Sequence, residues 1–230
     1  MAHRNAEFYS QDIVFRVEDD LFKVSQHLFV QHSQVFRDMF NIPQPEGIEP
    51  DGSSDERPLI LEGIEKQDFI QLLRCLYPSQ FQRAPGCGFS LDQWKSVLKL
   101  SCLYGMIEVK EFAVDCLTTL LKAESPSLQI HLAQLYDVPK WLQPAKTRLV
   151  ERSGPIDEND GQLIGLTFAL EVCALREKAL REKALLEKTL REKALLEKTL
   201  LENKLRETAQ RAKILEEKLD TSLHKNKKRK

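Results

Sequence analysis

Cysteine is scarce in this sequence, and no two cysteines stand in a paired spacing. The five lie at positions 75, 87, 102, 116 and 173 without a Cys-x-x-Cys pair, and this odd, scattered set is a poor disulfide framework of the kind that stabilises small secreted domains. Cys75, Cys102 and Cys116 fall on apolar faces of predicted helices, where a free cysteine packs as a small hydrophobic residue. This usage favours a reducing compartment, the nucleus or the cytoplasm.

Long apolar runs are also absent. No stretch of about 18 apolar residues could span a bilayer. The N-terminus lacks the apolar run that is typical of a signal peptide. We therefore expect no membrane association.

Residue patterns typical of an enzyme or a metalloprotein are missing as well. The histidines have no metal-ligand spacing with cysteines or carboxylates. Gly86-Cys87-Gly88 is an isolated turn rather than a phosphate-binding loop, and neither a serine nucleophile elbow nor a catalytic carboxylate pair is present. We expect no catalytic residues, no cofactor and no metal ion.

The charges that are present are distributed unequally along the chain. Residues 1–160 carry 16 basic and 24 acidic side chains, whereas residues 161–230 carry 18 basic and 11 acidic ones. The formal charges of the two parts are therefore −8 and +7, although the whole chain has a formal charge of −1. An acidic globular part with a basic arm is typical of an interaction module that carries a tail.

Alternating apolar residues predict a small sheet near the N-terminus. A strand at 13–17 is followed by the acidic turn 18–20 and by a second strand at 21–24, which can return antiparallel to the first. A proline-rich loop at 41–57 separates them from a short third strand at 59–61.

Helical spacing of apolar residues predicts helices in most of the rest of the first 155 residues. Ser25 and Ser33 precede two short helices that reach Phe40, and Ser90 with Gln93 forms a capping box.

Ser125 opens a further helix, with proline at the first helical position. Four of its residues are predicted to face inward: Leu128, Leu132, Leu135 and Tyr136. A proline-containing turn and a short helix follow, and the chain breaks at 153–155.

Several strings along this part resemble the BTB/POZ domain, and most closely the set of these domains that is expanded in mushroom-forming (basidiomycete) fungi. The strings are 12–19 (DIVFRVED), 35–40 (VFRDMF), 52–56 (GSSDE), 61–64 (LEGI), 72–78 (LLRCLYP), 132–138 (LAQLYDV) and 141–145 (WLQPA). The resemblance implies an α+β fold, in which a small, mostly antiparallel sheet is combined with helical hairpins. We expect this domain to be followed by a helical extension and a long C-terminal helix.

The resemblance also implies a function and a division of the chain. The family's members bind proteins, so we expect a homo-oligomeric scaffold, with a transcriptional corepressor as one class of partner. The alternative is a substrate adaptor of a cullin-RING ubiquitin ligase, although no hydrophobic-x-Glu motif follows residue 77. The expected segments are an N-terminal tail at 1–11, the BTB/POZ domain at 12–122, the extension at 123–155, the charged helix at 156–223 and a basic tail at 224–230.

A five-residue repeat (LREKA, LLEKT) begins at Leu175 and predicts a helix from about Gln162 to Leu223, roughly 90 Å long. Five residues rotate by roughly 140° about the helix axis, so the repeated leucines are distributed around the whole helix and do not form a leucine zipper. A weaker stripe at eleven-residue spacing favours self-association through a nearly straight bundle. The residues proposed for it are Leu186, Leu190, Leu201, Leu205, Leu215 and Leu219.

Two other interpretations of this arm stay open. The helix could be monomeric, because Glu–Arg pairs such as Glu177 with Arg181 stabilise it by about 0.2–0.5 kcal/mol each. The repeat could also be an expansion without a selected role.

The last residues form a basic cluster, with candidate nuclear-localisation residues Lys225, Lys227, Lys228, Arg229 and Lys230. The alternatives are a solvated tail or a weak electrostatic contact with nucleic acid. No aromatic residue is interleaved with these charges, so base stacking is not indicated.

Overall fold

The computed structural model describes residues 3, 5, 9, 11–43, 49–77 and 88–227, and in the final helix it describes side chains through Leu215 and at Lys218. The chain divides into two compact units, Met1–Ala169 and Leu170–Lys230. The first contains the sheet and most of the helices, and the second belongs to the long terminal helix.

The sheet has three strands in the order β2-β1-β3. Strand β1 (Asp12–Val17) pairs antiparallel with β2 (Asp20–Ser25) through a tight turn, in which Glu18 has a φ of 53°. Strand β3 (Leu59–Ile60) pairs with β1 in parallel. The predicted α+β class is confirmed, and the sheet combines one antiparallel with one parallel pairing.

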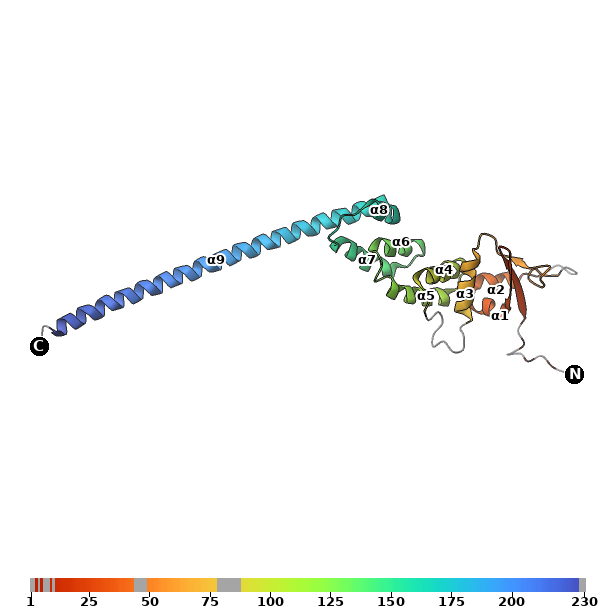
Figure 1. Cartoon of the computed structure of the whole chain (residues 1–230), viewed down its shortest axis with the longest axis horizontal. Helices are drawn as coiled ribbons and strands as arrows, with labels where there is room; N and C mark the ends of the chain where they lie inside the picture. Colours follow the sequence, from red (N-terminus) through yellow and green to blue (C-terminus); the bar gives the residue numbers. More distant parts are fainter. Residues whose placement is uncertain are drawn as a thin grey trace. The chain divides into compact units, whose positions relative to one another are not determined.

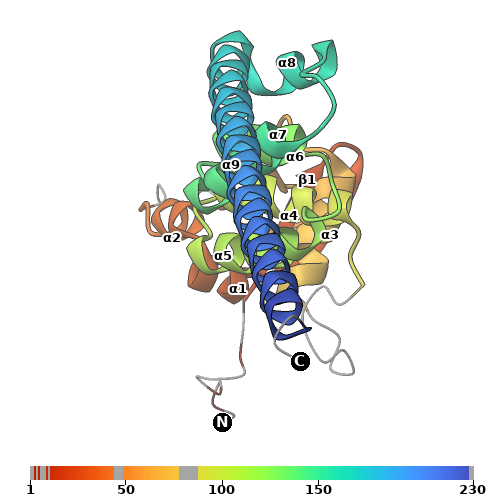
Figure 2. The same ribbon diagram turned by 90° about the vertical axis from the view of Figure 1, so that its left-hand side faces the viewer.

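Helices form the remainder of the described fold (Figure 1). They are α1 (Gln26–His32), α2 (Gln34–Phe40), α3 (Lys66–Leu76), α4 (Leu91–Leu103), α5 (Ile107–Leu120), α6 (Pro126–Leu135), α7 (Pro139–Glu151), α8 (Glu158–Ile164) and α9 (Leu166–Lys227). Helices α3, α4 and α5 pack in succession, α1 contacts α5, and α6 pairs with α7 (Figures 1 and 2).

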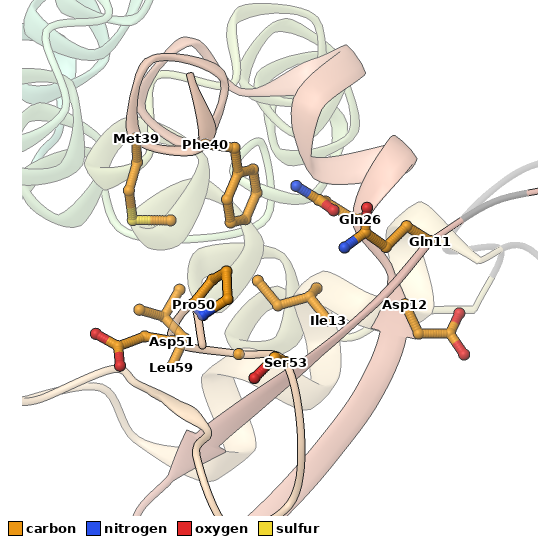
Figure 3. Close-up of a pocket in the computed structure, with 11 residues that line it drawn as sticks. Gln11, Asp12, Ile13, Gln26, Met39, Phe40, Pro50, Asp51, Ser53 and Leu59 are labelled. Atoms are coloured by element: carbon orange, nitrogen blue, oxygen red, sulfur yellow. The ribbon is translucent and has the colours of Figure 1, made fainter. Parts of the chain in front are cut away.

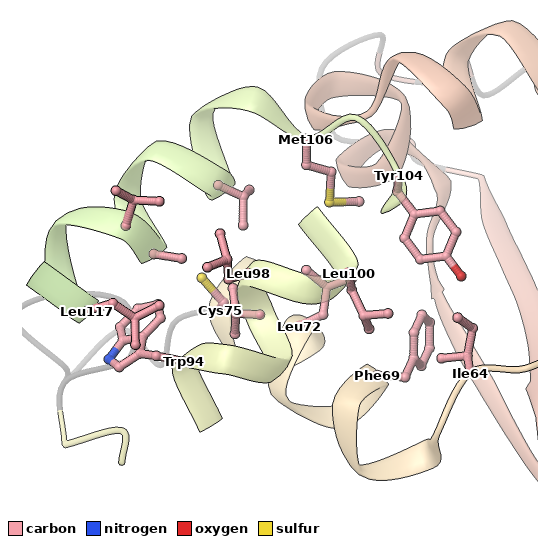
Figure 4. Close-up of a cluster of buried hydrophobic side chains, with 14 of the residues drawn as sticks. Ile64, Phe69, Leu72, Cys75, Trp94, Leu98, Leu100, Tyr104, Met106 and Leu117 are labelled. Atoms are coloured by element: carbon pink, nitrogen blue, oxygen red, sulfur yellow. The ribbon is translucent and has the colours of Figure 1, made fainter. Parts of the chain in front are cut away.

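The core joins the sheet to the helices. The Phe15 ring is fully buried and its centroid lies 4.9 Å from that of Phe29 and 5.5 Å from those of Phe36 and Phe69. Such aromatic pairs stabilise a core by about 0.5–1.5 kcal/mol beyond the area that they bury. A second part of the core lies between α3, α4 and α5, where side chains including Leu72, Trp94, Leu98 and Leu117 converge (Figure 4).

Local capping determines where several helices begin. The Ser90 hydroxyl accepts from the Gln93 amide, and the Gln93 side chain accepts from the Ser90 amide, so the predicted capping box is confirmed. Ser33 and Ser125 also cap their helices through their hydroxyl groups. Ser25 precedes α1 as predicted, but its side chain makes no capping hydrogen bond.

A buried ion pair fastens α8 to α6 and α7. The Asp160 carboxylate is 3% exposed and accepts from the Ser127 hydroxyl and the Arg152 guanidinium. Burial on its own would raise the pKa of Asp160, but these bonds and the amide of Asp157 outweigh it and lower that pKa to about 2. The carboxylate is therefore held ionised where α8 meets α6 and the end of α7.

The long helix begins at Leu166, a few residues after its predicted start. Gly165 separates it from α8 with a φ of +79°, a left-handed conformation that glycine adopts at no steric cost. The break falls where the sequence has Gly161 and Gly165 around a short apolar segment.

Candidate interaction surfaces

Two helix-ending turns in the first unit have the same construction. Gly105 follows α4 with a φ of +60°, and Asp137 follows α6 with a φ of +51°. In each turn the next amide bonds back to the carbonyl five residues earlier: Met106 N to Ser101 O at 2.8 Å, and Val138 N to Ala133 O at 2.9 Å. This is the long hydrogen bond of a Schellman motif, which closes a helix and redirects the chain.

A groove lies along these two turns. It consists of two adjoining hollows of ≈ 550 and ≈ 360 Å³, which share Ile107, Lys110 and Asp137. We call it the turn groove. Its other lining residues are Ser101, Cys102, Gly105, Met106, Glu111, Val114, Asp115, Leu135, Tyr136, Val138, Pro139 and Lys140.

Large apolar side chains border the turn groove and face solvent. Ile107 is 69% exposed and Leu135 is 60% exposed. The prediction that Leu135 faces inward is wrong: it is the last residue of α6 and lies roughly 140° around the helix from the fully buried Ile130. Leu135 is therefore an exposed apolar residue at a position that the sequence spacing predicted to be buried in the core.

Charges of both signs surround the apolar floor of the groove. Lys140 Nζ lies 2.6 Å from Asp115 Oδ1, so this ion pair connects α7 with α5. Lys110, Glu111 and Asp137 also line the groove. An apolar centre with a polar, mixed-charge border is the composition of protein-binding surfaces.

Two buried or half-buried cysteines, one in the turn groove and one on α3, are held as neutral thiols. Burial raises the pKa of Cys102, which lines the groove, and raises that of Cys75 to about 11. Because the thiolate is the reactive form, these residues are suited to packing rather than to nucleophilic chemistry.

A separate hollow, with a volume of ≈ 350 Å³, lies where β1 begins (Figure 3). Met39 and Phe40 of α2 face Pro50 and Ile13 across it. Gly52 closes its wall with a φ of +85°, and a Cβ there would lie 2.6 Å from Ile13 Cγ1. The wall thus depends on the close approach that only glycine permits.

In α9, the stripe residues Leu186, Leu190, Leu201, Leu205 and Leu215 are 57–71% exposed. The sixth, Leu219, lies on the helix, but its side chain is outside the described residues. The Arg181 Nη2 atom donates to Glu177 Oε2 at 3.2 Å, so one of the predicted pairs is formed. The leucines are therefore presented at the surface rather than packed within the chain.

The structure describes little of the candidate nuclear signal. The backbones of Lys225 and Lys227 continue α9, while their side chains and the whole of Lys228, Arg229 and Lys230 lie outside the described residues.

Among the residues that the structure describes, no group of three or more His, Cys, Asp or Glu side chains could hold a metal ion. None of the described helices is both long and apolar enough to span a bilayer.

Comparison with known proteins identifies a family. The sequence model of the BTB/POZ domain family matches residues 2–121. No curated protein matches the chain. The matched range ends at the C-terminus of α5, so the turn groove is lined partly by that range and partly by the residues that follow it.

Proposed function

Because this chain belongs to the BTB/POZ domain family, we propose that it is a non-catalytic scaffold that binds a partner protein in the turn groove and self-associates through α9. Domains of this family are generally protein-interaction modules. The observation that carries the proposal is the pair of exposed apolar residues, Ile107 and Leu135, that line a preformed groove.

The construction of the groove supports this role. Its two turns are fixed by backbone hydrogen bonds, and Met106 and Val138 are buried directly after them. A groove that is formed before binding loses little conformational entropy when a partner enters. The exposed side chains can then supply apolar contact area without a rearrangement of the core.

The test compares captured proteins between two variants of the full chain. Ile107→Glu places a charge in the groove, whereas Leu21→Glu places one on a residue of β2 that is 46% exposed and does not line the groove. We expect a set of partners that is lost with Ile107→Glu and retained with Leu21→Glu. Equal capture by both variants would contradict a role for the groove.

Self-association through α9 is supported by the exposed leucines of its repeats. So many exposed large apolar side chains on one helix favour a contact with another protein. The predicted stripe from Leu186 to Leu219 is the first candidate for that contact. Light scattering that gives one chain per particle over the accessible concentration range would contradict it.

A cullin-ligase adaptor is the second candidate. The location of the groove favours it, since α5 ends the matched BTB/POZ range and α6 and α7 form the other side. A partner in this groove would contact the domain and its helical extension at the same time. Pull-down with the N-terminal domain of a cullin tests this directly, and no binding at micromolar concentration would remove the candidate.

The basic tail supports a role in the nucleus, in transcriptional regulation through a bound corepressor. Lysine and arginine clusters serve as nuclear import signals and as contacts for polyanions. The strings at 12–19 and 52–56 support placing the chain in the set of BTB/POZ proteins that is expanded in mushroom-forming fungi.

A further inference from the structure

The leucines of α9 include three adjacent pairs: Leu185 with Leu186, Leu195 with Leu196, and Leu200 with Leu201. All six side chains are 56–72% exposed. Neighbouring residues of an α-helix point about 100° apart. The two members of a pair therefore cannot both lie in the narrow seam that faces a single partner helix.

Because the sequence repeats every ten residues, successive leucine pairs point in different directions around the helix axis. Residues 181–190 and 191–200 have the same sequence, REKALLEKTL. Ten residues fall about 80° short of three full turns, so the second copy points in another direction. Between residues 180 and 205, no sector of the helix wider than about 80° lacks a leucine. A helix that is apolar on several sides is typical of one surrounded by others.

We propose that α9 assembles with at least two further copies of itself in a bundle of three or more helices, rather than as a two-stranded coiled coil. This inference rests on the proposed self-association and adds the number of strands. A three-stranded or larger bundle gives each helix two neighbours, which can cover two apolar faces about 100° apart.

The charges of the repeat indicate that the neighbours are copies of this helix. Every repeat combines glutamate with lysine or arginine, and ion pairs such as Glu177 with Arg181 form within the helix. Positive and negative side chains are closely interspersed on this surface, so two copies of it can pack together without net repulsion. A partner with many charges of one sign would instead meet many like charges. The repetition also lets copies re-form the same contacts after a shift of ten residues, about 15 Å.

Light scattering on the full chain tests the proposal with two triple variants. The first carries Leu186→Gln, Leu190→Gln and Leu201→Gln on one face, and the second carries Leu185→Gln, Leu196→Gln and Leu200→Gln on the other. The control carries Lys178→Gln, Lys188→Gln and Lys198→Gln. Glutamine is a good helix former, so circular dichroism is expected to show unchanged helicity in all three.

We expect three or more chains per particle in the unchanged protein and in the control, and fewer in both leucine variants. Two chains per particle, whichever variant dissociates them, would overturn the bundle and leave self-association standing. A single chain, or a particle that neither leucine variant changes, would overturn self-association through α9 itself.

Discussion

Gly105 and Asp137 occupy the same left-handed position at the ends of two different helices, with φ values of +60° and +51°. Each is followed by a buried residue whose amide closes the turn, Met106 in one case and Val138 in the other. The turn groove lies along these two turns, so its shape depends on backbone conformation as well as on side-chain packing.

The first prediction concerns those two positions. Gly105→Ala is expected to lower the free energy of unfolding by about 1–2 kcal/mol, because a Cβ is strained in the left-handed conformation. Space is available for it, since the nearest atom to a Cβ there is Val35 Cγ2 at 3.8 Å. Asp137→Gly, the matched control, should leave stability within about 0.5 kcal/mol. Urea unfolding measures both, and an equal loss in the two variants would contradict the backbone explanation.

The second prediction concerns Asp160 and pH. Its pKa is lowered from 3.8 to about 2 in the folded chain, so the folded state binds this proton less readily than the unfolded state. The resulting stabilisation is complete above pH 4 and is lost as the pH falls from 4 to 2. Asp160→Asn should cost about 3 kcal/mol at pH 7, because it leaves the Arg152 charge without its carboxylate.

Unfolding measured across this pH range checks the result. Asp55→Asn, at an exposed position, is the control and should keep the full acid transition. A wild-type curve that Asp160→Asn merely shifts in parallel, with the same loss between pH 4 and 2, would show that another group is responsible.

The third prediction compares two neighbouring residues of the groove. Met106 is fully buried and Ile107 is 69% exposed. Met106→Ala should lower the free energy of unfolding by about 2–5 kcal/mol through the cavity that it leaves. Ile107→Ala should change it by no more than about 0.5 kcal/mol. A large loss of stability in Ile107→Ala would mean that this residue serves the core rather than a partner.

The fourth prediction concerns the basic tail. Deletion of residues 224–230 should reduce nuclear retention of a fluorescent fusion, because five of these seven residues are lysine or arginine. Replacing Lys204 and Lys213 by Gln, which removes two basic charges elsewhere on α9, is the control. An unchanged distribution after the deletion would remove the nuclear signal.

Features encoded by neighbouring residues could be predicted from the sequence. The capping box at Ser90 and Gln93 and the hairpin turn after Val17 depend on contacts only a few residues apart. The family resemblance supplied the α+β class. The parallel pairing of Phe15 with Leu59 was not foreseen, because it joins residues more than forty positions apart.

The surface of the turn groove was harder to predict, because the exposure of a residue depends on which neighbour covers it. Leu135 has the spacing of a buried residue. It is exposed because α6 ends at this residue and the chain turns at Asp137. The signal that could have found this turn is an aspartate before a valine and a proline, at 137–139. The network of Ser127, Arg152 and Asp160 gave no local signal, since its members lie on separate elements.

Photo-cross-linking tests the central claim most directly. A photoreactive phenylalanine analogue is introduced separately at Ile107, at Leu135 and, as the control, at Leu21. The proposed docking surface predicts that the same partner is cross-linked from positions 107 and 135 and not from position 21. Cross-linking from position 21 alone, or to the same extent from all three, would contradict it.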